Sequence, residues 1–458
     1  MCQLYNIAWG EYRWSVIKLQ HRPWLWPPLL HMCANNEANM SSVAFGEQTE
    51  HGQEDKLLHR VIAKIAARHP TKPALYWTKA SFTYNEMEHL ASQLAVNLES
   101  LGVAAGKIVP LCFEQSVWAV VAMLAVMKAG AAFLALDASL PLSMQGQRIA
   151  QTGSNVVVAS PATEPLCRGS ADHVISLSSQ LLHRLSKSQN DPVHLSNVLP
   201  SGNPAYVVYT SGTTGPPKAV VVNHAAISTI LPLHATTLRI GASSRVLQFS
   251  SYAFDASLCE ILTTLAVGGT LCVPTEAERM ANIAAFIINA RVDTALLTPS
   301  FAATFTPDYV PCLKTLVICG EAPTRRVLDR WFGHVELINA YGPAEACICC
   351  AVYAYESVDD VPTTIGRGYA HALRVVDPGD HCELVSADNV GELVVCGPLL
   401  ARGYLDDTAR TTSSFIREAP WMSSTQREHK VRFYKTGDLV KYNSRGLLEY
   451  VGRKDVGL

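Results

Sequence analysis

A large charge of one sign is what this sequence lacks most clearly. Its 37 lysine and arginine residues nearly balance its 39 aspartate and glutamate residues, so the 458-residue chain has a formal net charge of −2. Nucleic-acid-binding domains carry a strongly basic patch or stripe, and we therefore expect no nucleic-acid partner. Hydrophobic residues make up 48% of the chain and charged residues 17%, which predicts a well-packed α/β protein of two or three structural units.

The sequence shows no recognisable secretory signal, and its 13 cysteines are odd in number and scattered. A reducing cytosol is the simplest setting for such thiols, so we expect a cytoplasmic protein. The sequence CICC at residues 347–350 has the spacing of a metal or redox motif, but a second pair and a nearby histidine cluster are missing. We instead predict a strand for residues 347–350, in which alternate side chains share a face and Ile348 and Cys350 lie on the same side.

An uninterrupted apolar run of membrane-spanning length is also missing. Residues 117–136 (VWAVVAMLAVMKAGAAFLAL) approach that length, but Lys128 stands near the middle, and Lys-Ala-Gly divides the run. We predict a buried helix followed by a core strand, and no membrane partner.

The chain becomes regular only from about residue 57. Residues 1–50 hold four of the eight tryptophans without a clear period, and this N-terminal extension is left unassigned. Strand and helix patterns alternate over about 57–350, which predicts largely parallel sheets, and Thr83 is the expected N-cap of one helix. Over about 360–452, short strands and turns predict a smaller β-rich subdomain.

Residues 206–224 read YVVYTSGTTGPPKAVVVNH, two hydrophobic runs around a stretch of small and ring-constrained residues. Both runs predict buried strands. Between them, residues 211–215 can direct successive backbone N–H groups at one point, because glycine allows the positive φ angles of an anion-binding nest. Lys218 adds a positive charge at the rim. The predicted guest is a polyphosphate, and a plain hairpin with a Gly-Pro turn is the alternative.

The loop does not have the spacing of a Walker motif. That motif reads G-x-x-x-x-G-K-[ST] and opens a helix. Counting from Gly212, the position of the second glycine holds Pro217, Lys218 is followed by Ala219, and a strand pattern comes next. The P-loop kinase and GTPase interpretation therefore fails.

Seven stretches resemble the adenylate-forming enzyme superfamily, and most closely the amino-acid-activating (adenylation) domain of nonribosomal peptide synthetases. In family order they are MKAGAAFLALD (127–137), YTSGTTGPPKAVVV (209–222), FDASLCE (254–260), NAYGPAEACI (339–348), GELVVCGPLLARGYLDD (391–407), YKTGDLVKY (434–442) and GRKD (452–455). The resemblance implies an α/β fold over 57–455, with two stacked, mostly parallel sheet subdomains and a small β-barrel-like subdomain.

The resemblance also implies ATP and Mg²⁺ as cofactors. In the loop, the residues that match those around the β and γ phosphates are Thr210, Ser211, Gly212, Thr213, Thr214, Gly215 and Lys218. Tyr341 matches the aromatic residue on the adenine face, and Glu345 matches the Mg²⁺ ligand, a role that suits a hard carboxylate. Asp438 matches the acceptor of the ribose hydroxyls, and Arg453 a contact to ribose and phosphate. Taken singly, these could be a core aromatic and solvated turn residues.

The implied reaction has two halves. A carboxylate attacks the α-phosphate of Mg-ATP and gives an acyl adenylate and pyrophosphate. The thiol of a phosphopantetheine arm, on a separate carrier domain, then takes the acyl group. The first half needs positioning and charge neutralisation more than covalent help from the protein.

Asp255 in FDASLCE indicates which acid is activated. In the amino-acid-activating branch the matching aspartate pairs with the α-ammonium group of the substrate, and a carboxylate in an apolar pocket is costly unless a cation meets it. The alternative is an exposed aspartate at a helix start. The other positions that match the pocket are Ala256, Cys259, Leu297, Val317, Cys319, Ala340, Ile348 and Cys349. None of them carries a charge and most are small, which predicts an aromatic or large aliphatic amino acid.

The sequence ends soon after the last matching stretch. In relatives, the residue that matches Asp455 is a hinge before a C-terminal lid subdomain, which supplies a lysine to the adenylation step. Here only residues 456–458 follow, so we expect that lid to be missing and activity to be impaired. The main hypothesis is an amino-acid adenylating enzyme, present here as a fragment or completed by a partner such as a carrier protein or other synthetase domains. A non-catalytic remnant that binds ATP and an amino acid, and a relative of acyl-CoA or aryl-acid ligases, are the alternatives.

Overall fold

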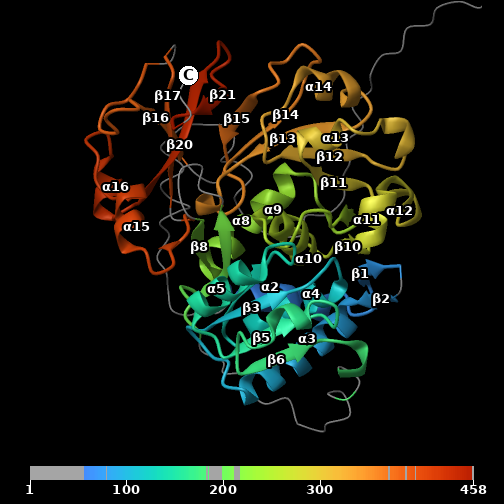
Figure 1. Ribbon diagram of the computed structural model, residues 1–458. Coiled ribbons are helices and arrows are strands. Elements are labelled where there is room, and N and C mark those ends of the chain that lie inside the picture. Colours follow the sequence, from blue (N-terminus) through green and yellow to red (C-terminus); the bar gives the residue numbers. More distant parts are fainter. Residues whose placement is uncertain are drawn as a thin grey trace, which may run out of the picture. The chain divides into compact units, whose positions relative to one another are not determined.

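The computed structural model describes residues 56–78, 80–181, 184, 199–210, 217–369, 372–386, 389–397 and 399–455 (Figure 1). The chain divides into two units, Met1–Gly46 and Glu47–Leu458, and every described residue belongs to the second. The extension at residues 1–50 and the stub at 456–458 lie outside the described residues.

The helix expected after Thr83 forms as α3 (Tyr84–Ser100), and side chains cap its start. The Thr83 hydroxyl accepts a hydrogen bond from the Glu86 N–H, and the Glu86 carboxylate accepts one from the Thr83 N–H at 2.7 Å. This reciprocal capping box satisfies two backbone donors near the helix start. The N-cap prediction is confirmed.

The apolar run at residues 117–136 forms a buried helix, α4 (Val117–Lys128), and a core strand, β4 (Ala132–Leu136), as predicted. Lys128 is buried and forms an ion pair with Glu88 of α3, so the positive charge within the apolar run is neutralised by a carboxylate. Among the helices that the structure describes, none has both the length and the apolar character needed to cross a membrane.

Six strands from the blue and green part of the chain and one from the orange part, β18, form a seven-stranded sheet (Figure 1). In order across the sheet, its strands are β18 (Gly403–Tyr404), β8 (Lys218–Asn223), β7 (Pro204–Thr210), β4, β3 (Ile108–Cys112), β5 (Val156–Ala159) and β6 (His173–Ser176). The strands from β7 to β6 pair in parallel, whereas β8 is antiparallel to β7 and β18 is antiparallel to β8. Helices in this part are α2 (Leu58–Arg68), α3, α4, α5 (Leu142–Thr152), α6 (Glu164–Cys167) and α8 (His224–Thr237).

The second sheet has 14 strands and continues into the β-rich end of the chain. Its path runs through β16 (Ala372–Val376), β17 (Gly391–Cys396), β20 (Phe433–Tyr442), β21 (Leu448–Arg453), β15 (Thr364–Gly368), β14 (Ala351–Ala354), β13 (Glu336–Tyr341), β12 (Thr315–Cys319), β11 (Thr294–Leu297), β9 (Arg245–Leu247), β10 (Thr270–Val273), β1 (Pro73–Trp77) and β2 (Ala80–Thr83), and β19 (Phe415–Ile416) pairs with β20 off this path. From β13 to β1 the strands are parallel, and from β13 to β16 they are antiparallel.

Short helices connect these strands. They are α9 (Asp255–Leu258), the π-helical turn η4 (Cys259–Thr263), α10 (Thr264–Ala266), α11 (Glu276–Ala281), α12 (Ile283–Asn289), α13 (Pro299–Ala302), the 3₁₀ turn η5 (Pro307–Tyr309), α14 (Arg325–Trp331), the 3₁₀ turn η6 (Ala344–Ala346), α15 (Thr408–Ser414) and α16 (Ser424–Glu428). Each sheet contains a run of parallel strands joined by helices, which confirms the predicted α/β class, but the larger sheet is mixed and not mostly parallel as expected.

The expected small β-barrel does not close. Its strands are β15 to β17, β20 and β21, and they extend the large sheet as an open antiparallel path. Among the described residues, β16 pairs along its length only with β17 and ends the path. Because β15 is already paired on both sides, with β14 and β21, it has no free edge through which the path could close.

The prediction of a strand at residues 347–350 is wrong. β13 ends at Tyr341 and β14 begins opposite it at Ala351, so the intervening residues must reverse the chain. They do so through η6 and through left-handed backbone at Cys347 (φ 57°) and Ile348 (φ 81°). A Cβ at Gly342 would clash with the carbonyl oxygen of Ile348, which shows how tightly this turn folds on itself.

We predict that Thr83→Ala lowers the free energy of unfolding by about 1 kcal/mol, because the α3 start loses its side-chain cap. Urea denaturation measures this change. Thr83→Ser is the matched control, since it keeps the hydroxyl acceptor and should unfold close to the wild-type midpoint. Equal loss in both variants would show that the methyl group, and not the cap, stabilises this site.

Candidate functional site

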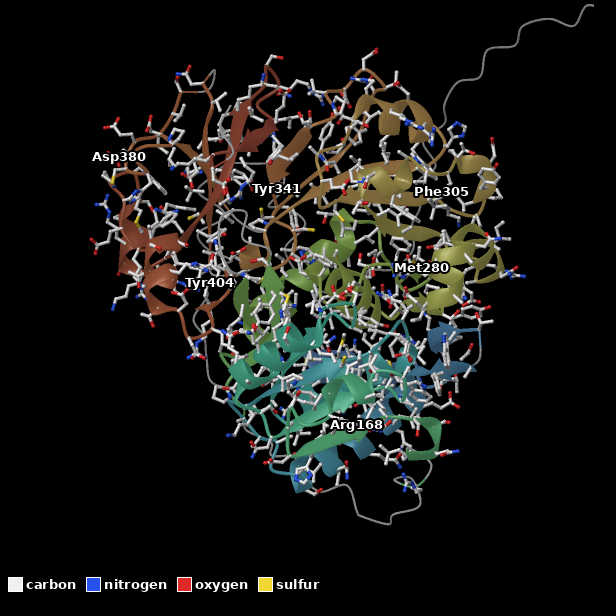
Figure 2. The ribbon with its side chains drawn as sticks, viewed as in Figure 1. Arg168, Met280, Phe305, Tyr341, Asp380 and Tyr404 are labelled. Carbon is white, nitrogen blue, oxygen red and sulfur yellow. The ribbon has the colours of Figure 1, made fainter. Side chains whose placement is uncertain are left out.

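A cavity of about 790 Å³ opens at the carboxyl ends of β12 and β13 and beside β20 and β21. Ligands of open α/β sheets bind at such strand ends. Six of the residues predicted for the nucleotide site line this cavity: Thr210, Lys218, Tyr341, Glu345, Asp438 and Arg453. Figure 2 labels Tyr341, the last residue of β13, near the red and orange strands. The structure therefore brings together residues that are more than two hundred positions apart in the sequence.

Asp438 is the centre of one hydrogen-bond group in the cavity. The Tyr341 hydroxyl donates to Asp438 Oδ2 at 2.5 Å, and the Arg453 guanidinium lies 3.1 Å from Asp438 Oδ1. Asp438 and Arg453 stand opposite each other on β20 and β21, so sheet register fixes their pairing. Burial raises the pKa of Asp438, while the hydrogen bond from Tyr341 and the charge of Arg453 act in the opposite direction.

Glu345 lies on η6 and is only 4% exposed. The Tyr404 hydroxyl donates a hydrogen bond to Glu345 Oε1 at 2.8 Å. Among the described residues, no lysine or arginine forms an ion pair with this carboxylate. A buried carboxylate without a cationic partner, on the wall of a cavity, has the donor chemistry of a Mg²⁺ ligand.

Asp255 begins α9, and a π-helical turn follows directly at Cys259–Thr263. The side chain is half-buried, unlike the exposed helix-start aspartate that was the alternative. Burial, followed by the charge of Glu345, raises the pKa of Asp255 to about 7. The hydroxyl of Tyr206, on which the charge of Asp255 acts, is buried and has no hydrogen-bond partner among the described residues. Both groups are suited to a polar or cationic ligand.

The predicted pocket residues fall into two groups. In one core cluster, or packed against it, lie Cys259, Val317, Cys319, Ala340, Ile348 and Cys349. The Cys259 and Cys349 thiols shift each other's pKa and therefore lie close together, and the charge of Asp255 acts on Cys319 and Cys349. Ala256 follows Asp255 in α9 and is half-buried.

Leu297 is the exception, because it packs in a different core cluster. Successive residues of a strand face opposite sides of the sheet. Leu296 stands opposite Val317 on β11 and β12 and shares its cluster, so Leu296 and not Leu297 lies on the pocket side. The alternation of the strand was the signal that could have identified Leu296.

The flanks of the predicted phosphate loop form the hairpin β7–β8, with Thr210 opposite Lys218. This confirms both strands and the absence of a following Walker-type helix. Lys218 Nζ lies 5.4 Å from the centre of the Tyr404 ring. The remaining predicted loop residues lie outside the described part of the chain: Ser211, Gly212, Thr213, Thr214 and Gly215.

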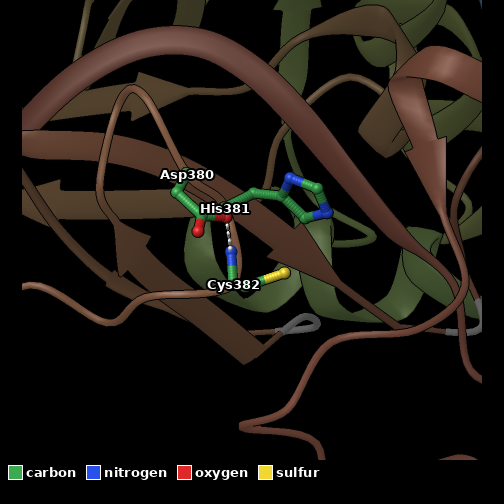
Figure 3. A group of neighbouring side chains, drawn as sticks. All are labelled: Asp380, His381 and Cys382. Carbon is green, nitrogen blue, oxygen red and sulfur yellow. Dashed lines mark hydrogen bonds between the residues drawn. The ribbon is translucent and has the colours of Figure 1, made fainter.

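A second group of potential metal ligands was not predicted from the sequence. Asp380, His381 and Cys382 are consecutive residues after β16, and their donor atoms lie within 4.8 Å of one another (Figure 3). The Asp380 carboxylate already accepts a hydrogen bond from the Cys382 N–H at 2.9 Å. None of the three lines the cavity described above, and they are better explained as turn residues.

Comparison with known proteins agrees with this geometry. Residues 62–405 match the family described as AMP-binding enzyme. The chain is 41% identical over 425 residues to nonribosomal peptide synthetase 5 of Gibberella zeae, covering 91% of this chain and 4% of that protein. It is 40% identical over 401 residues to N-benzoylphenylalaninol synthetase apmA of Penicillium brevicompactum, covering 88% of this chain and 17% of that protein.

Solved structures show the same fold. The N-terminal subdomain of NpsA from Klebsiella oxytoca, in complex with 3-hydroxyanthranilyl-AMSN, has a TM-score of 0.75 at 24% identity and covers 86% of this chain and 99% of that chain. The AMPPNP-bound form of the nonribosomal peptide synthetase FmoA3 has a TM-score of 0.75 at 23% identity. The match covers 92% of this chain and 45% of that chain. The chain thus spans a small part of the synthetases that it matches in sequence. It belongs to the AMP-binding enzyme family of adenylate-forming ligases, and nonribosomal peptide synthetases are among its relatives.

Proposed function

We propose that this chain activates an amino acid as an aminoacyl adenylate. The observation that carries the proposal is Asp255, a half-buried carboxylate with a raised pKa and no ion-pair partner among the described residues. Its charge acts on the Cys319 and Cys349 thiols, and these pack in the same core cluster as Ala340, which lines the cavity. An amino acid brings the α-ammonium group that such a carboxylate requires.

ATP would occupy the cavity, with its adenine against the Tyr341 ring and its ribose hydroxyls at Asp438, beside Arg453. Thr210 and Lys218 line the same cavity and are proposed for the phosphate end. The proposal includes Ser211, Gly212, Thr213, Thr214 and Gly215 as further phosphate contacts, because hydroxyls and glycine N–H groups in a turn bind anions.

Glu345 would hold Mg²⁺, which when bound neutralises part of the phosphate charge. Its buried carboxylate and the neighbouring Tyr404 hydroxyl fit that role, as the donor is hard, oriented and free of an ion-pair partner among the described residues. The chain's own residues then position the substrate carboxylate against the α-phosphate. The new bond forms between a carboxylate oxygen and this phosphorus, and the bond to the pyrophosphate oxygen breaks.

The substrate side chain would lie among small apolar residues. The proposed lining is Ala256, Cys259, Leu296, Val317, Cys319, Ala340, Ile348 and Cys349. Since none of these is charged, a charged substrate side chain would be left unpaired, and an aromatic or large aliphatic amino acid is favoured.

The relatives are multidomain synthetases, so a carrier domain with a phosphopantetheine thiol is the proposed acceptor of the acyl group. The eleven cysteines that the structure describes are free thiols, which is consistent with a reducing cytoplasm.

An aryl-acid or acyl-CoA ligase activity is the second candidate, since the NpsA neighbour was solved with 3-hydroxyanthranilyl-AMSN. Such acids lack an α-ammonium group, and Asp255 would then remain without a cation. A remnant that binds ATP and an amino acid without turnover is distinguished by the same experiment.

We predict amino-acid-dependent ATP–pyrophosphate exchange by the 458-residue chain, strongest with an aromatic or large aliphatic amino acid. Asp255→Ala should reduce the exchange by about 100-fold or more, because one partner of a buried charge pair is lost. Asp308→Ala, at an exposed aspartate, should retain it. The des-amino analogue of the best substrate should not support exchange.

Exchange that Asp255→Ala leaves intact would contradict the assigned role of this aspartate. Exchange with aryl acids only would favour the second candidate. A folded chain that binds ATP but gives no exchange with any acid would support the remnant.

We also predict that Asp255→Asn stabilises the ligand-free protein at neutral pH. The folded-state pKa of about 7 lies above the unfolded value near 4, so the stability that Asp255 contributes is fully present below about pH 4 and is lost as the pH rises through about 7. The advantage of Asp255→Asn should grow over that window to about 1–3 kcal/mol. Urea denaturation at several pH values measures it, with Asp308→Asn as the control. A pH-independent difference would show that Asp255 does not take up a proton on folding.

A further inference from the structure

Tyr404, which Figure 2 labels, contacts two residues of the cavity wall that come from distant segments of the chain, Glu345 and Lys218. Its hydroxyl donates to Glu345 Oε1 at 2.8 Å, and Lys218 Nζ lies 5.4 Å from the centre of its ring. Tyr404 is 7% exposed, and Glu345 is equally inaccessible. One side chain therefore contacts both the proposed metal ligand and the lysine of the phosphate hairpin.

The backbone holds Tyr404 in this place. Strand β18 pairs with β8, with Tyr404 opposite Val220, and the Tyr404 N–H donates to Thr411 Oγ1 at 2.9 Å. The preceding residue, Gly403, has φ 144°, and a Cβ there would lie 2.5 Å from Thr411 Cγ2. The strand pair on one side and α15 on the other leave little room for Tyr404 to move away from Glu345.

A second tyrosine supports the same carboxylate. Burial, followed by the charge of Glu345 and the neighbouring Tyr404 hydroxyl, raises the pKa of Tyr434 on β20, so its hydroxyl lies near the same carboxylate. The Phe415 ring lies between the two tyrosines, with its centre 5.8 Å from that of Tyr404 and 5.0 Å from that of Tyr434. The Phe415 ring therefore packs against both tyrosines, whose hydroxyls are the polar groups that lie near Glu345.

The choice of hydroxyl donors has a chemical consequence. An arginine or lysine in this place would orient the carboxylate but would also neutralise it and compete with a bound cation. A tyrosine hydroxyl donates one neutral hydrogen bond, so it fixes the carboxylate and leaves its negative charge in place. This arrangement suits a carboxylate that must bind a divalent cation.

We propose that Tyr404, supported by Tyr434, is a positioning residue that orients Glu345 toward the Mg²⁺ of the bound nucleotide. The proposal rests on the proposed function, because it takes Glu345 as the metal ligand. Hydrogen-bond partners of metal ligands fix the orientation of the ligand, and their loss typically costs about 10–100-fold in metal affinity.

Tyr404→Phe tests this inference, because it removes the hydroxyl and keeps the ring beside Lys218. Isothermal titration measures the binding of AMP-PNP, a non-hydrolysable ATP analogue, over a series of Mg²⁺ concentrations and in EDTA. We expect the Mg²⁺ concentration for half-maximal enhancement of binding to rise about 10-fold. Binding in EDTA should stay at the wild-type value.

Tyr84→Phe is the matched control. Tyr84 is fully buried, and its hydroxyl donates to the Gly269 carbonyl at the same distance of 2.8 Å, away from Glu345. It should leave the Mg²⁺ requirement unchanged, even where it lowers the thermal midpoint. If Tyr404→Phe does not fold, Tyr434→Phe takes its place and should also raise the Mg²⁺ requirement.

A folded Tyr404→Phe protein with the wild-type Mg²⁺ requirement would overturn the inference. Weaker AMP-PNP binding by the same factor with and without Mg²⁺ would also overturn it, since a structural role would act in this way. If the wild-type chain binds AMP-PNP without any enhancement by Mg²⁺, then Glu345 is not a metal ligand and the inference fails, whereas the proposed function is tested separately by amino-acid-dependent ATP–pyrophosphate exchange.

Discussion

The cleft depends on buried carboxylates that the described side chains do not fully neutralise. Asp438 has Arg453 beside it, but Asp255 and Glu345 form no ion pair among the described residues, and the charge of Glu345 helps to raise the pKa of Asp255. Burying such groups costs free energy unless a cation arrives. The fold maintains part of this arrangement, because strand register places Asp438 opposite Arg453 and the Tyr404 hydroxyl holds Glu345. A ligand that carries positive charge would relieve the cost, which couples binding to the electrostatics of the core.

Local patterns in the sequence predicted much of the fold. The capped helix after Thr83, the division of the apolar run at Lys128 and the hairpin around residues 211–216 all depend on neighbouring residues, so a window of the sequence contains the necessary information. The residues proposed for the nucleotide site came from the family resemblance, in which each lies in a short recognisable stretch. Their convergence on one cavity is a tertiary result that the order of the stretches could only suggest.

The wrong predictions share a different physical origin. The alternation of residues 347–350 indicated a strand, but the reversal between two antiparallel strands dictated their backbone. The assignment of Leu297 was displaced by one residue because only strand pairing shows which face meets Val317. The barrel did not close because β14 and β21 already occupy both edges of β15. The role of Tyr404 depends on a partner in another segment, and no local pattern could reveal it.

The pairing of β18 with β8 also constrains how the protein is made. The seven-stranded sheet lacks its outer strand until the ribosome has synthesised Tyr404, long after β8 has emerged. Likewise, β1 near the start of the described chain finds its parallel neighbour β10 only much later. Contacts between such distant segments slow folding and leave strand edges unpaired during synthesis. No single cut in the chain would separate the two sheets, so they are expected to become stable together late in translation.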